Sequence, residues 1–313
     1  MSSETSNTAP STRPPFTSGW LAIPSPLARL FKKFPLLTYP PNELPTRSAS
    51  TRDVATLYVF ISDQYALKGL PSFNPSCLKW QTFLKLAGVE FQVAPSNNHA
   101  SPTGALPFLI PPSNTSNPSA HIPIPSNKLE KYAAEKGTSE IPDVSNLKLE
   151  AYESLLDYRI RNAWLYSLYL SRPNSALLSQ LYVEPISTSQ PIRATILYQL
   201  RHAAEAEILK STGTHVVNSR ALYRGAREAF EALSTVLGEE EWFFGVPEPT
   251  LFDAAVFAYT YLLLDDRFTW EDPRLREIVK EFPILIEHRN RILHRCWGIQ
   301  KAKKHSNLQR PMA

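Results

Sequence analysis

The stretch GALPFL, residues 104–109, places Pro107 at the entrance of an apolar segment that has the pattern of a strand. Cis peptide bonds occur mainly before proline, so the Leu106–Pro107 bond is a candidate cis bond, with an ordinary trans turn as the alternative. The stretch TLFD, residues 250–253, opens a second apolar segment. Thr250 and Asp253 have the spacing of a capping box, in which each side chain accepts from the other's backbone N–H. This spacing predicts the start of a buried helix.

Four strands and two helices are expected around Pro107. Segments that are β-branched, aromatic or alternating predict the strands, at 57–61, 89–93, 107–110 and 121–124. Apolar residues at helical spacing predict one helix that begins at a cap on Asn74 or Ser72, and another over 128–136. The order strand–helix–strand, then strand–strand–helix, is typical of a thioredoxin-like domain, expected here over residues 54–137. The proline bond before the third strand of such a domain is typically cis.

Residues 138–297 form the second expected domain, in which a polar linker at 138–146 is followed by helical patterns only. We expect helices at 147–170, 191–210, 216–237, 250–264, 274–280 and 284–295. The helix at 250–264 is apolar nearly all round, which predicts that it lies at the centre of its domain. The chain is therefore expected to combine an α+β domain with an all-helical domain.

The two ends of the chain differ in composition from this body. Residues 1–53 carry a net charge of +3, residues 289–313 carry +7, and the remainder carries −6. We expect residues 1–53 to form a Pro-rich arm that packs on the body or on a partner, with a disordered or transit-like leader as the alternative. Residues 298–313 form a basic tail, which suits anionic lipid or an acidic partner unless it only aids solubility.

An acidic body with basic ends does not favour nucleic-acid binding, because such proteins carry their basic stripe on the fold itself. The candidate partner or membrane contacts are Trp20, Leu30, Phe31, Phe34, Arg289, Arg291, Arg295, Lys301, Lys303 and Lys304.

Several kinds of site and segment are missing from the sequence. The longest apolar run, 254–264, is too short to span a bilayer, so any membrane association is expected to be peripheral. Cys77 and Cys296 form no zinc or CxxC spacing, and the seven histidines are scattered. The sequence contains neither a P-loop nor a GxGxxG motif. We expect no metal and no cofactor.

The quoted motifs and the domain order resemble the glutathione-transferase superfamily, and within it the metaxin family. The metaxin resemblance rests on KGLPS at 68–72, Cys77-Leu78 and GVPEPTLFDAAVF at 245–257, and it covers residues 57–297. It implies a glutathione-transferase-like fold, with an N-terminal thioredoxin-like domain and a C-terminal all-helical domain. The Pro-rich leader resembles that of the fungal metaxin-like subunit of the mitochondrial sorting and assembly machinery.

Metaxins are non-enzymatic, so the resemblance implies a binding and assembly function. The expected protein is a peripheral subunit on the cytosolic face of the mitochondrial outer membrane, capping an integral β-barrel insertase. Its expected partners are that insertase, a second metaxin-like subunit and β-barrel precursor proteins, with contact to the membrane surface left open.

A transferase of this fold would place a Tyr, Ser or Cys after the first strand to stabilise the glutathione thiolate. Tyr65, Ser72 and Ser76 are the candidates here, while Cys77 lies on the apolar side of its helix and is expected to be an inert core thiol. The family's acidic–Ser pair falls at Pro125–Ser126, where proline replaces the acidic residue. No catalytic or cofactor-binding residue is therefore assigned. A glutathione-dependent transferase or reductase is the competing hypothesis, and a scaffold unrelated to mitochondria is a third.

Overall fold

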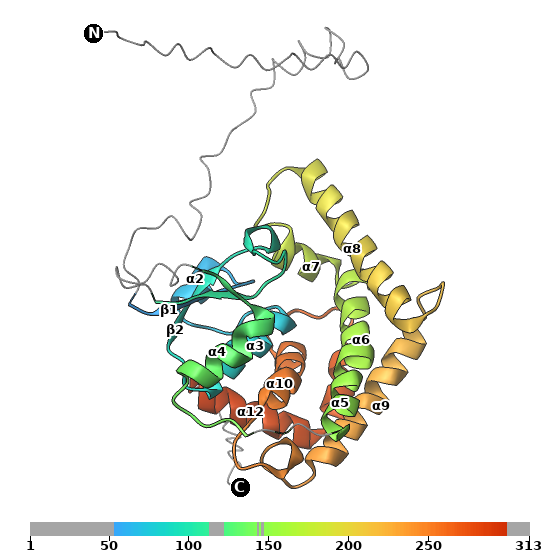
Figure 1. Ribbon diagram of the computed structural model, residues 1–313. Helices are drawn as coiled ribbons and strands as arrows, with labels where there is room; N and C mark the ends of the chain where they lie inside the picture. Colours follow the sequence, from blue (N-terminus) through green and yellow to red (C-terminus); the bar gives the residue numbers. More distant parts are fainter. Residues whose placement is uncertain (1–52, 113–121, 143, 145–146, 299–313) are drawn as a thin grey trace, which may run out of the picture. The chain divides into compact units, whose positions relative to one another are not determined.

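The computed structural model describes residues 53–112, 122–142, 144 and 147–298. Four strands form one sheet: β1 (Ala55–Val59), β2 (Phe91–Pro95), β3 (Phe108–Ile110) and β4 (Ile124–Pro125). The strand order is β2-β1-β3-β4, with β1 parallel to β2 and antiparallel to β3, and with β3 antiparallel to β4 (Figure 1). This is the thioredoxin-like arrangement that the order of elements predicted, and β4 lies at the sheet edge.

The first two strands differ from their predicted bounds by two residues in opposite directions. β1 ends at Val59, and the next carbonyl, that of Phe60, accepts a hydrogen bond from the Ser72 hydroxyl. β2 begins only at Phe91, because the N–H of Val89 bonds to Leu84 and so completes the turn that ends the preceding helix. Apolar alternation cannot reveal either bond.

Two helices belong to the sheet-containing half. They are α3 (Pro75–Leu86) and α4 (Leu129–Lys136). Asn74 caps α3 by accepting from the N–H of Cys77, which resolves the choice between Asn74 and Ser72. Shorter helical segments, which the sequence pattern did not predict, are α2 (Asp63–Leu67), η2 (Asn98–Ala100) and η4 (Ser126–Lys128).

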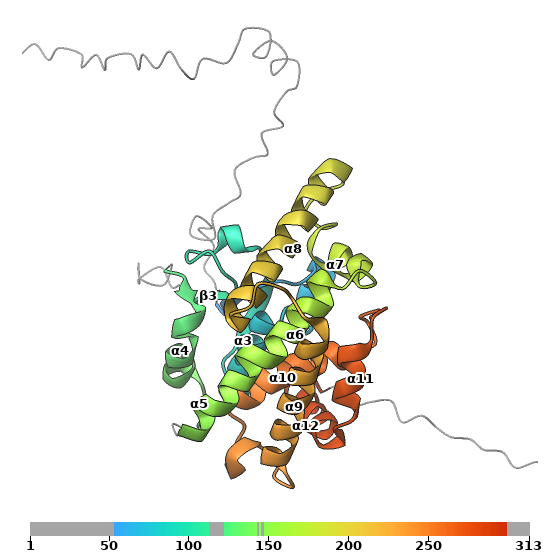
Figure 2. The same ribbon diagram turned by 90° about the vertical axis from the view of Figure 1, so that its right-hand side faces the viewer.

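The second half of the described chain is helical (Figure 2). The expected helix at 147–170 is continuous but contains two π-helical stretches: α5 (Leu147–Ser154), η5 (Leu155–Ile160), α6 (Arg161–Leu165) and η6 (Tyr166–Leu170). It is followed by α7 (Ser175–Tyr182), α8 (Gln190–Thr212), α9 (Ser219–Leu237), η7 (Phe243–Gly245), α10 (Leu251–Leu264), α11 (Arg274–Lys280) and α12 (Pro283–Trp297). Of these, α7 and η7 were not predicted.

The contact between α3 and α10 joins the two halves. Leu78 of α3 is fully buried within the core of the helical half, and Ala254 of α10 is fully buried within the core beneath the sheet. Each core therefore includes a side chain from the other half. This explains why α10 is apolar nearly all round, since it is packed on both sides.

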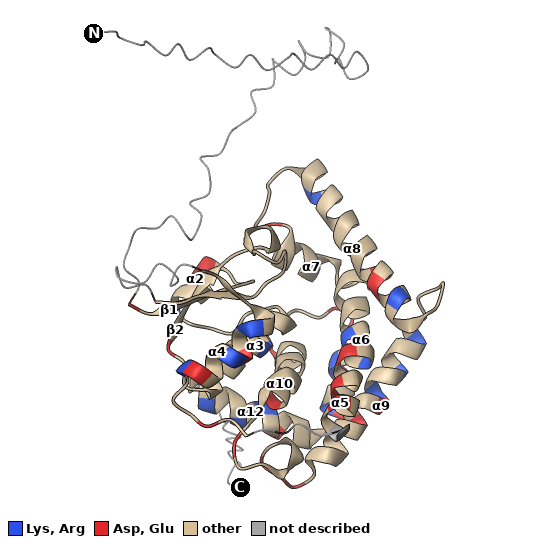
Figure 3. Cartoon of the chain, in the orientation of Figure 1, with Lys and Arg blue, Asp and Glu red and all other residues tan. Residues whose placement is uncertain are grey.

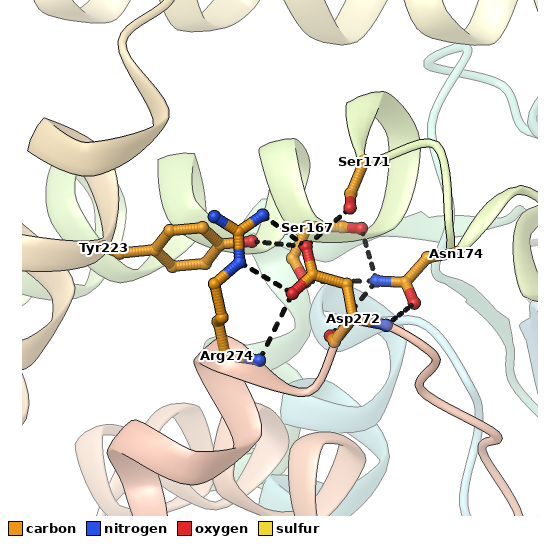
Figure 4. Close-up of polar contacts among 6 residues, drawn as sticks. All are labelled: Ser167, Ser171, Asn174, Tyr223, Asp272 and Arg274. Atoms are coloured by element: carbon orange, nitrogen blue, oxygen red, sulfur yellow. Dashed lines mark hydrogen bonds and ion pairs between the residues drawn. The ribbon is translucent and has the colours of Figure 1, made fainter.

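A buried polar network fixes the end of η6 (Figure 4). Asp272 accepts hydrogen bonds from the hydroxyls of Ser171 at 2.6 Å and Tyr223 at 3.3 Å, and its second oxygen pairs with Arg274 Nε at 2.8 Å. Asn174 receives the backbone N–H of Asp272 at 2.8 Å and donates to the carbonyl of Ser167. The network ties the loop before α11 to η6 and α9.

Candidate functional site

Ser72 is one of the hydroxyls that a transferase of this fold could use after its first strand, but its side chain is fully buried. Its Oγ donates to the carbonyl of Phe60 at 2.6 Å and accepts from the N–H of Asn74 at 3.2 Å. The backbone N–H of Ser72 donates to Gln81 Oε1 at 2.9 Å. The hydroxyl thus closes the loop between β1 and α3 and is not presented to a ligand.

Cys77 lies in the first turn of α3 and is fully buried. Burial raises the pKa of its thiol to about 12, which outweighs the opposing hydrogen bonds from Phe60 and Ser72. A thiol in this state is a poor nucleophile near neutral pH. Cys296, on α12, is likewise a free thiol whose pKa burial raises to about 12.

The two remaining candidate side chains after the first strand lie apart. Tyr65 on α2 is 39% exposed. The guanidinium carbon of Arg267 lies over its ring, 5.1 Å from the ring centroid of Tyr65. Ser76, at the start of α3, is exposed and lines a cavity described below. Arg267 in turn pairs with Asp265, and Arg276 pairs with Asp266.

The cis proline expected of a thioredoxin-like domain is present. The Leu106–Pro107 bond is cis. Pro125 lies in β4 opposite Phe108, and Ser126 begins η4. Proline supplies neither a carboxylate nor a backbone N–H at the position where the superfamily holds the end of glutathione.

The capping box at the start of α10 is part of a larger buried cluster. Both the N–H and the hydroxyl of Thr250 donate to Asp253 Oδ2 at 2.8 Å. The other carboxylate oxygen, Oδ1, receives the N–H of Phe243 at 3.0 Å and lies 2.9 Å from Nε2 of His288. Asp253 and His288 are both fully buried. Sequence patterns could not reveal this contact of His288, because α12 and α10 meet only in the folded chain.

The residues predicted to contact a partner or the membrane differ in their burial and in their contacts. Arg289 was predicted to contact a partner or the membrane, and this prediction is wrong because its side chain is buried. Its guanidinium lies 5.2 Å from the ring centroid of Tyr261. Arg291 is half-buried and donates to the carbonyl of Glu241, and Arg295 is exposed and pairs with Glu248. The other predicted contacts lie outside the described residues: Trp20, Leu30, Phe31, Phe34, Lys301, Lys303 and Lys304.

A cavity of about 320 Å³ lies beside the start of α3, with further lining from η5 and α10. It shares Glu153 and Leu251 with a neighbouring hollow of about 390 Å³ on the α4 side. It shares Asp157 and Arg161 with a hollow of about 570 Å³ on the α8 side.

The described part of the chain contains no group of three His, Cys, Asp or Glu side chains placed to hold a metal ion. None of its helices combines the length and apolar character needed to cross a bilayer.

Comparison with known proteins first defines the fold class. The glutathione S-transferase N-terminal domain family matches residues 75–174, and the glutathione S-transferase C-terminal domain family matches residues 226–292. With the thioredoxin-like sheet and the helices that follow it, these matches define a glutathione-transferase-like protein. Solved structures that resemble it include glutathione S-transferase III in its apo form, at 16% identity and a TM-score of 0.43, covering 77% of this chain and 91% of that one.

Comparison with individual proteins narrows the family within this fold class. The chain is 27% identical to metaxin-3 of Xenopus laevis, over 61% of this chain and 62% of the relative. It is 24% identical to metaxin-2 of Mus musculus, over 76% of this chain and 87% of the relative. It is 25% identical to Failed axon connections of Drosophila melanogaster, over 79% of this chain and 59% of the relative. The match thus spans less than two thirds of metaxin-3. The chain belongs to the metaxin family.

Proposed function

We propose that this chain is a non-enzymatic, peripheral subunit of the mitochondrial outer-membrane machinery that inserts β-barrel proteins. It would cap the barrel insertase on the cytosolic side and help to bind or release β-barrel precursors. Its membership of the metaxin family supports the proposal. The observation that carries the non-enzymatic part is the state of Ser72, whose hydroxyl is buried and bonded to the protein's own backbone.

The proposed partners are the integral β-barrel insertase, a second metaxin-like subunit and the precursors, as for the fungal metaxin-like subunit that the leader resembles. The domains would be residues 54–137 and 138–297, flanked by an arm (1–53) and a basic tail (298–313) that contact a partner or the membrane surface. Of the cationic side chains proposed for this contact within the described residues, Arg295 is exposed.

The proposal is tested by affinity purification of the tagged full chain from detergent-solubilised mitochondria of its source, followed by identification of the proteins that co-elute. We expect an integral β-barrel protein and a second metaxin-like chain. Recovery of neither, from membranes in which both are detectable, would contradict the proposal.

A glutathione-dependent enzyme is the competing function, because both matched domain families are those of glutathione S-transferases. It predicts retention on immobilised glutathione and thiol-conjugating activity that Ser72→Ala or Cys77→Ala abolishes. We expect neither retention nor activity, since both side chains are buried.

A further inference from the structure

The first half of α8 is covered less than its second half. The helix begins at Gln190, yet no residue of α8 before Ala204 is buried. Its inner side packs on the core of the helical half through three partly buried side chains, Ile196, Leu197 and Leu200. In both views the N-terminal turns of α8 extend past α6 and α7 (Figures 1 and 2). The outer side of this half of the helix therefore has no cover within the described chain.

Three large apolar side chains are exposed at this end of α8. Ile186, in the turn before the helix, is 63% exposed, Ile192 in the first helical turn is 50% exposed, and Tyr198 is 69% exposed. Tyr198 lies about 9 Å along the helix from Ile192. Single exposed apolar side chains are common, but several on one projecting end mark an interaction surface. We refer to residues 186–201 as the α8 tip.

The α8 tip is basic. It contains Arg193 and Arg201 and no Asp or Glu, and Figure 3 shows no acidic residue on the upper part of α8. Neither guanidinium pairs with a carboxylate of the described residues. Arg193 donates to the carbonyl of Ser187 at 2.6 Å, and Arg201 donates to the hydroxyl of Ser175 at 2.6 Å. Since a guanidinium has five N–H donors, each arginine keeps donors for an anionic group outside the chain.

An anionic lipid surface matches both the apolar and the basic character of the α8 tip. Lipid phosphates attract arginine, acyl chains accommodate isoleucine, and tyrosine is enriched at the boundary between the two. A helix with such side chains on its outer side lies in the plane of the membrane interface and does not cross the bilayer. Because the tip extends past the neighbouring helices, a flat surface can reach it before it meets them.

We propose that the α8 tip docks on an anionic lipid surface. Ile186 and Ile192 insert below the headgroups, and Tyr198 lies at their level. Arg193 and Arg201 bind the lipid phosphates. The inference rests on the peripheral membrane position in the proposed function, to which it adds a contact on the folded body of the chain.

The test is flotation of the purified full chain with two kinds of vesicle. One kind is phosphatidylcholine alone, and in the other about one third of the lipid is phosphatidylserine. We expect binding to the anionic vesicles to be at least about tenfold stronger, since each arginine near such a surface contributes about fivefold.

Ile192→Asp should weaken binding to the anionic vesicles by at least about tenfold, because it removes an inserted apolar side chain and adds a negative charge. Val216→Asp is the matched control, because Val216 is exposed, receives the same charge and follows the opposite end of α8. It lies about 30 Å away along the helix, beyond the range of screened charges, so binding should stay within about twofold of the wild type. Both variants should keep the wild-type unfolding midpoint, since neither site is buried.

A second pair of variants tests the charge of the tip. Arg193→Gln should weaken binding to the anionic vesicles about fivefold. Lys210→Gln removes one positive charge from the last turn of α8 and should leave binding nearly unchanged.

Equal losses of binding in Ile192→Asp and Val216→Asp would overturn the inference, because other parts of the chain would then hold the vesicles. Equal binding of the full chain to both kinds of vesicle, or to neither, would also overturn it. A third contrary result is normal vesicle binding by Ile192→Asp with loss of the co-purified insertase, which would identify an acidic protein surface as the partner of the tip.

Co-purification in detergent separates this inference from the assembly function, because no bilayer is present there. We expect Ile192→Asp to retain the barrel insertase as the wild type does. Retained insertase with unaltered vesicle binding in this variant would refute the lipid contact alone. A wild-type chain that shows the expected vesicle pattern but recovers no insertase would refute the assembly function alone.

Discussion

At the scale of single residues, hydroxyls close together in sequence have different surroundings. Ser72 is fully buried and bonded to Phe60 and Asn74, whereas Ser76 is exposed at the start of α3. The spacing of the sequence allowed either residue to serve a transferase. Because Ser72 is buried and bonded to the backbone, we infer that its hydroxyl stabilises the loop between β1 and α3.

Ser72→Ala should lower the free energy of unfolding by about 1–3 kcal/mol, because it leaves the Phe60 carbonyl and the Asn74 N–H without their partner. Ser76→Ala should change it by less than about 0.5 kcal/mol, as at most exposed sites. Urea unfolding of both variants measures the difference. Equal, small effects would show that the Ser72 bonds do not stabilise the loop.

Asp272 should make the stability of the fold depend on pH in acid. Hydrogen bonds from Arg274, outweighing burial, lower the pKa of Asp272 to about 2 from its usual 3.8. Because the folded-state pKa lies below the unfolded one, this stabilisation is present above about pH 4 and is lost as the pH falls toward 2.

Asp272→Asn should therefore flatten the pH dependence of the unfolding free energy between pH 4 and 2. Chemical unfolding at several pH values checks this, with Glu228→Gln as the exposed control. A variant whose acid dependence matches the wild type would show that Asp272 is not responsible.

At the scale of elements, the stability of α10 depends on the hydrogen bonds at its N-terminus. Thr250, Phe252 and Asp253 at this start are buried. In the capping box the Thr250 hydroxyl accepts from the backbone N–H of Asp253, and the Asp253 carboxylate accepts from the backbone N–H of Thr250 and of Phe243. His288 extends the same cluster to α12.

Asp253→Ala should destabilise the chain by at least about 3 kcal/mol, because several buried donors lose their acceptor at once. Thr250→Ser keeps the hydroxyl and should cost much less. Thermal unfolding followed by circular dichroism ranks the two. Similar losses would mean that the carboxylate is not the centre of the cluster.

The sequence predicted the long helices better than the short ones. The span 274–280 matched α11, and the helix over 147–170 was expected, since apolar periodicity is a local property. The short helices α2 and α7 were missed, because a helix of five to eight residues leaves little periodicity to detect.

At the scale of the whole molecule, the last helix limits which truncation leaves the fold intact. Trp297 stacks on Phe257 with ring centroids 5.6 Å apart and donates to the carbonyl of Gly69 at 3.0 Å. Cutting the chain after Arg295 would remove this side chain and both contacts. The basic tail is better removed after Gly298.

Removal of residues 1–53, or of residues 299–313, should weaken association with the barrel insertase while leaving the unfolding midpoint of the remaining chain nearly unchanged. Co-purification and thermal unfolding of each truncation measure the two effects separately. A chain cut after Arg295 should in contrast unfold earlier, since it loses Trp297. Full co-purification of both shorter chains would contradict a role for the ends in assembly.

The sequence by itself determined the order of the strands and of the longer helices, the proline before β3, the cap on α10 and the resemblance to metaxins. Each of these depends on residues close together in the chain or on a local pattern. Only the tertiary structure decided that Ser72 bonds to Phe60, that His288 meets Asp253, that Arg289 is buried and that Tyr259 and Asp157 line one cavity. These contacts join segments distant in sequence, and burial and charge balance arise only where such segments pack.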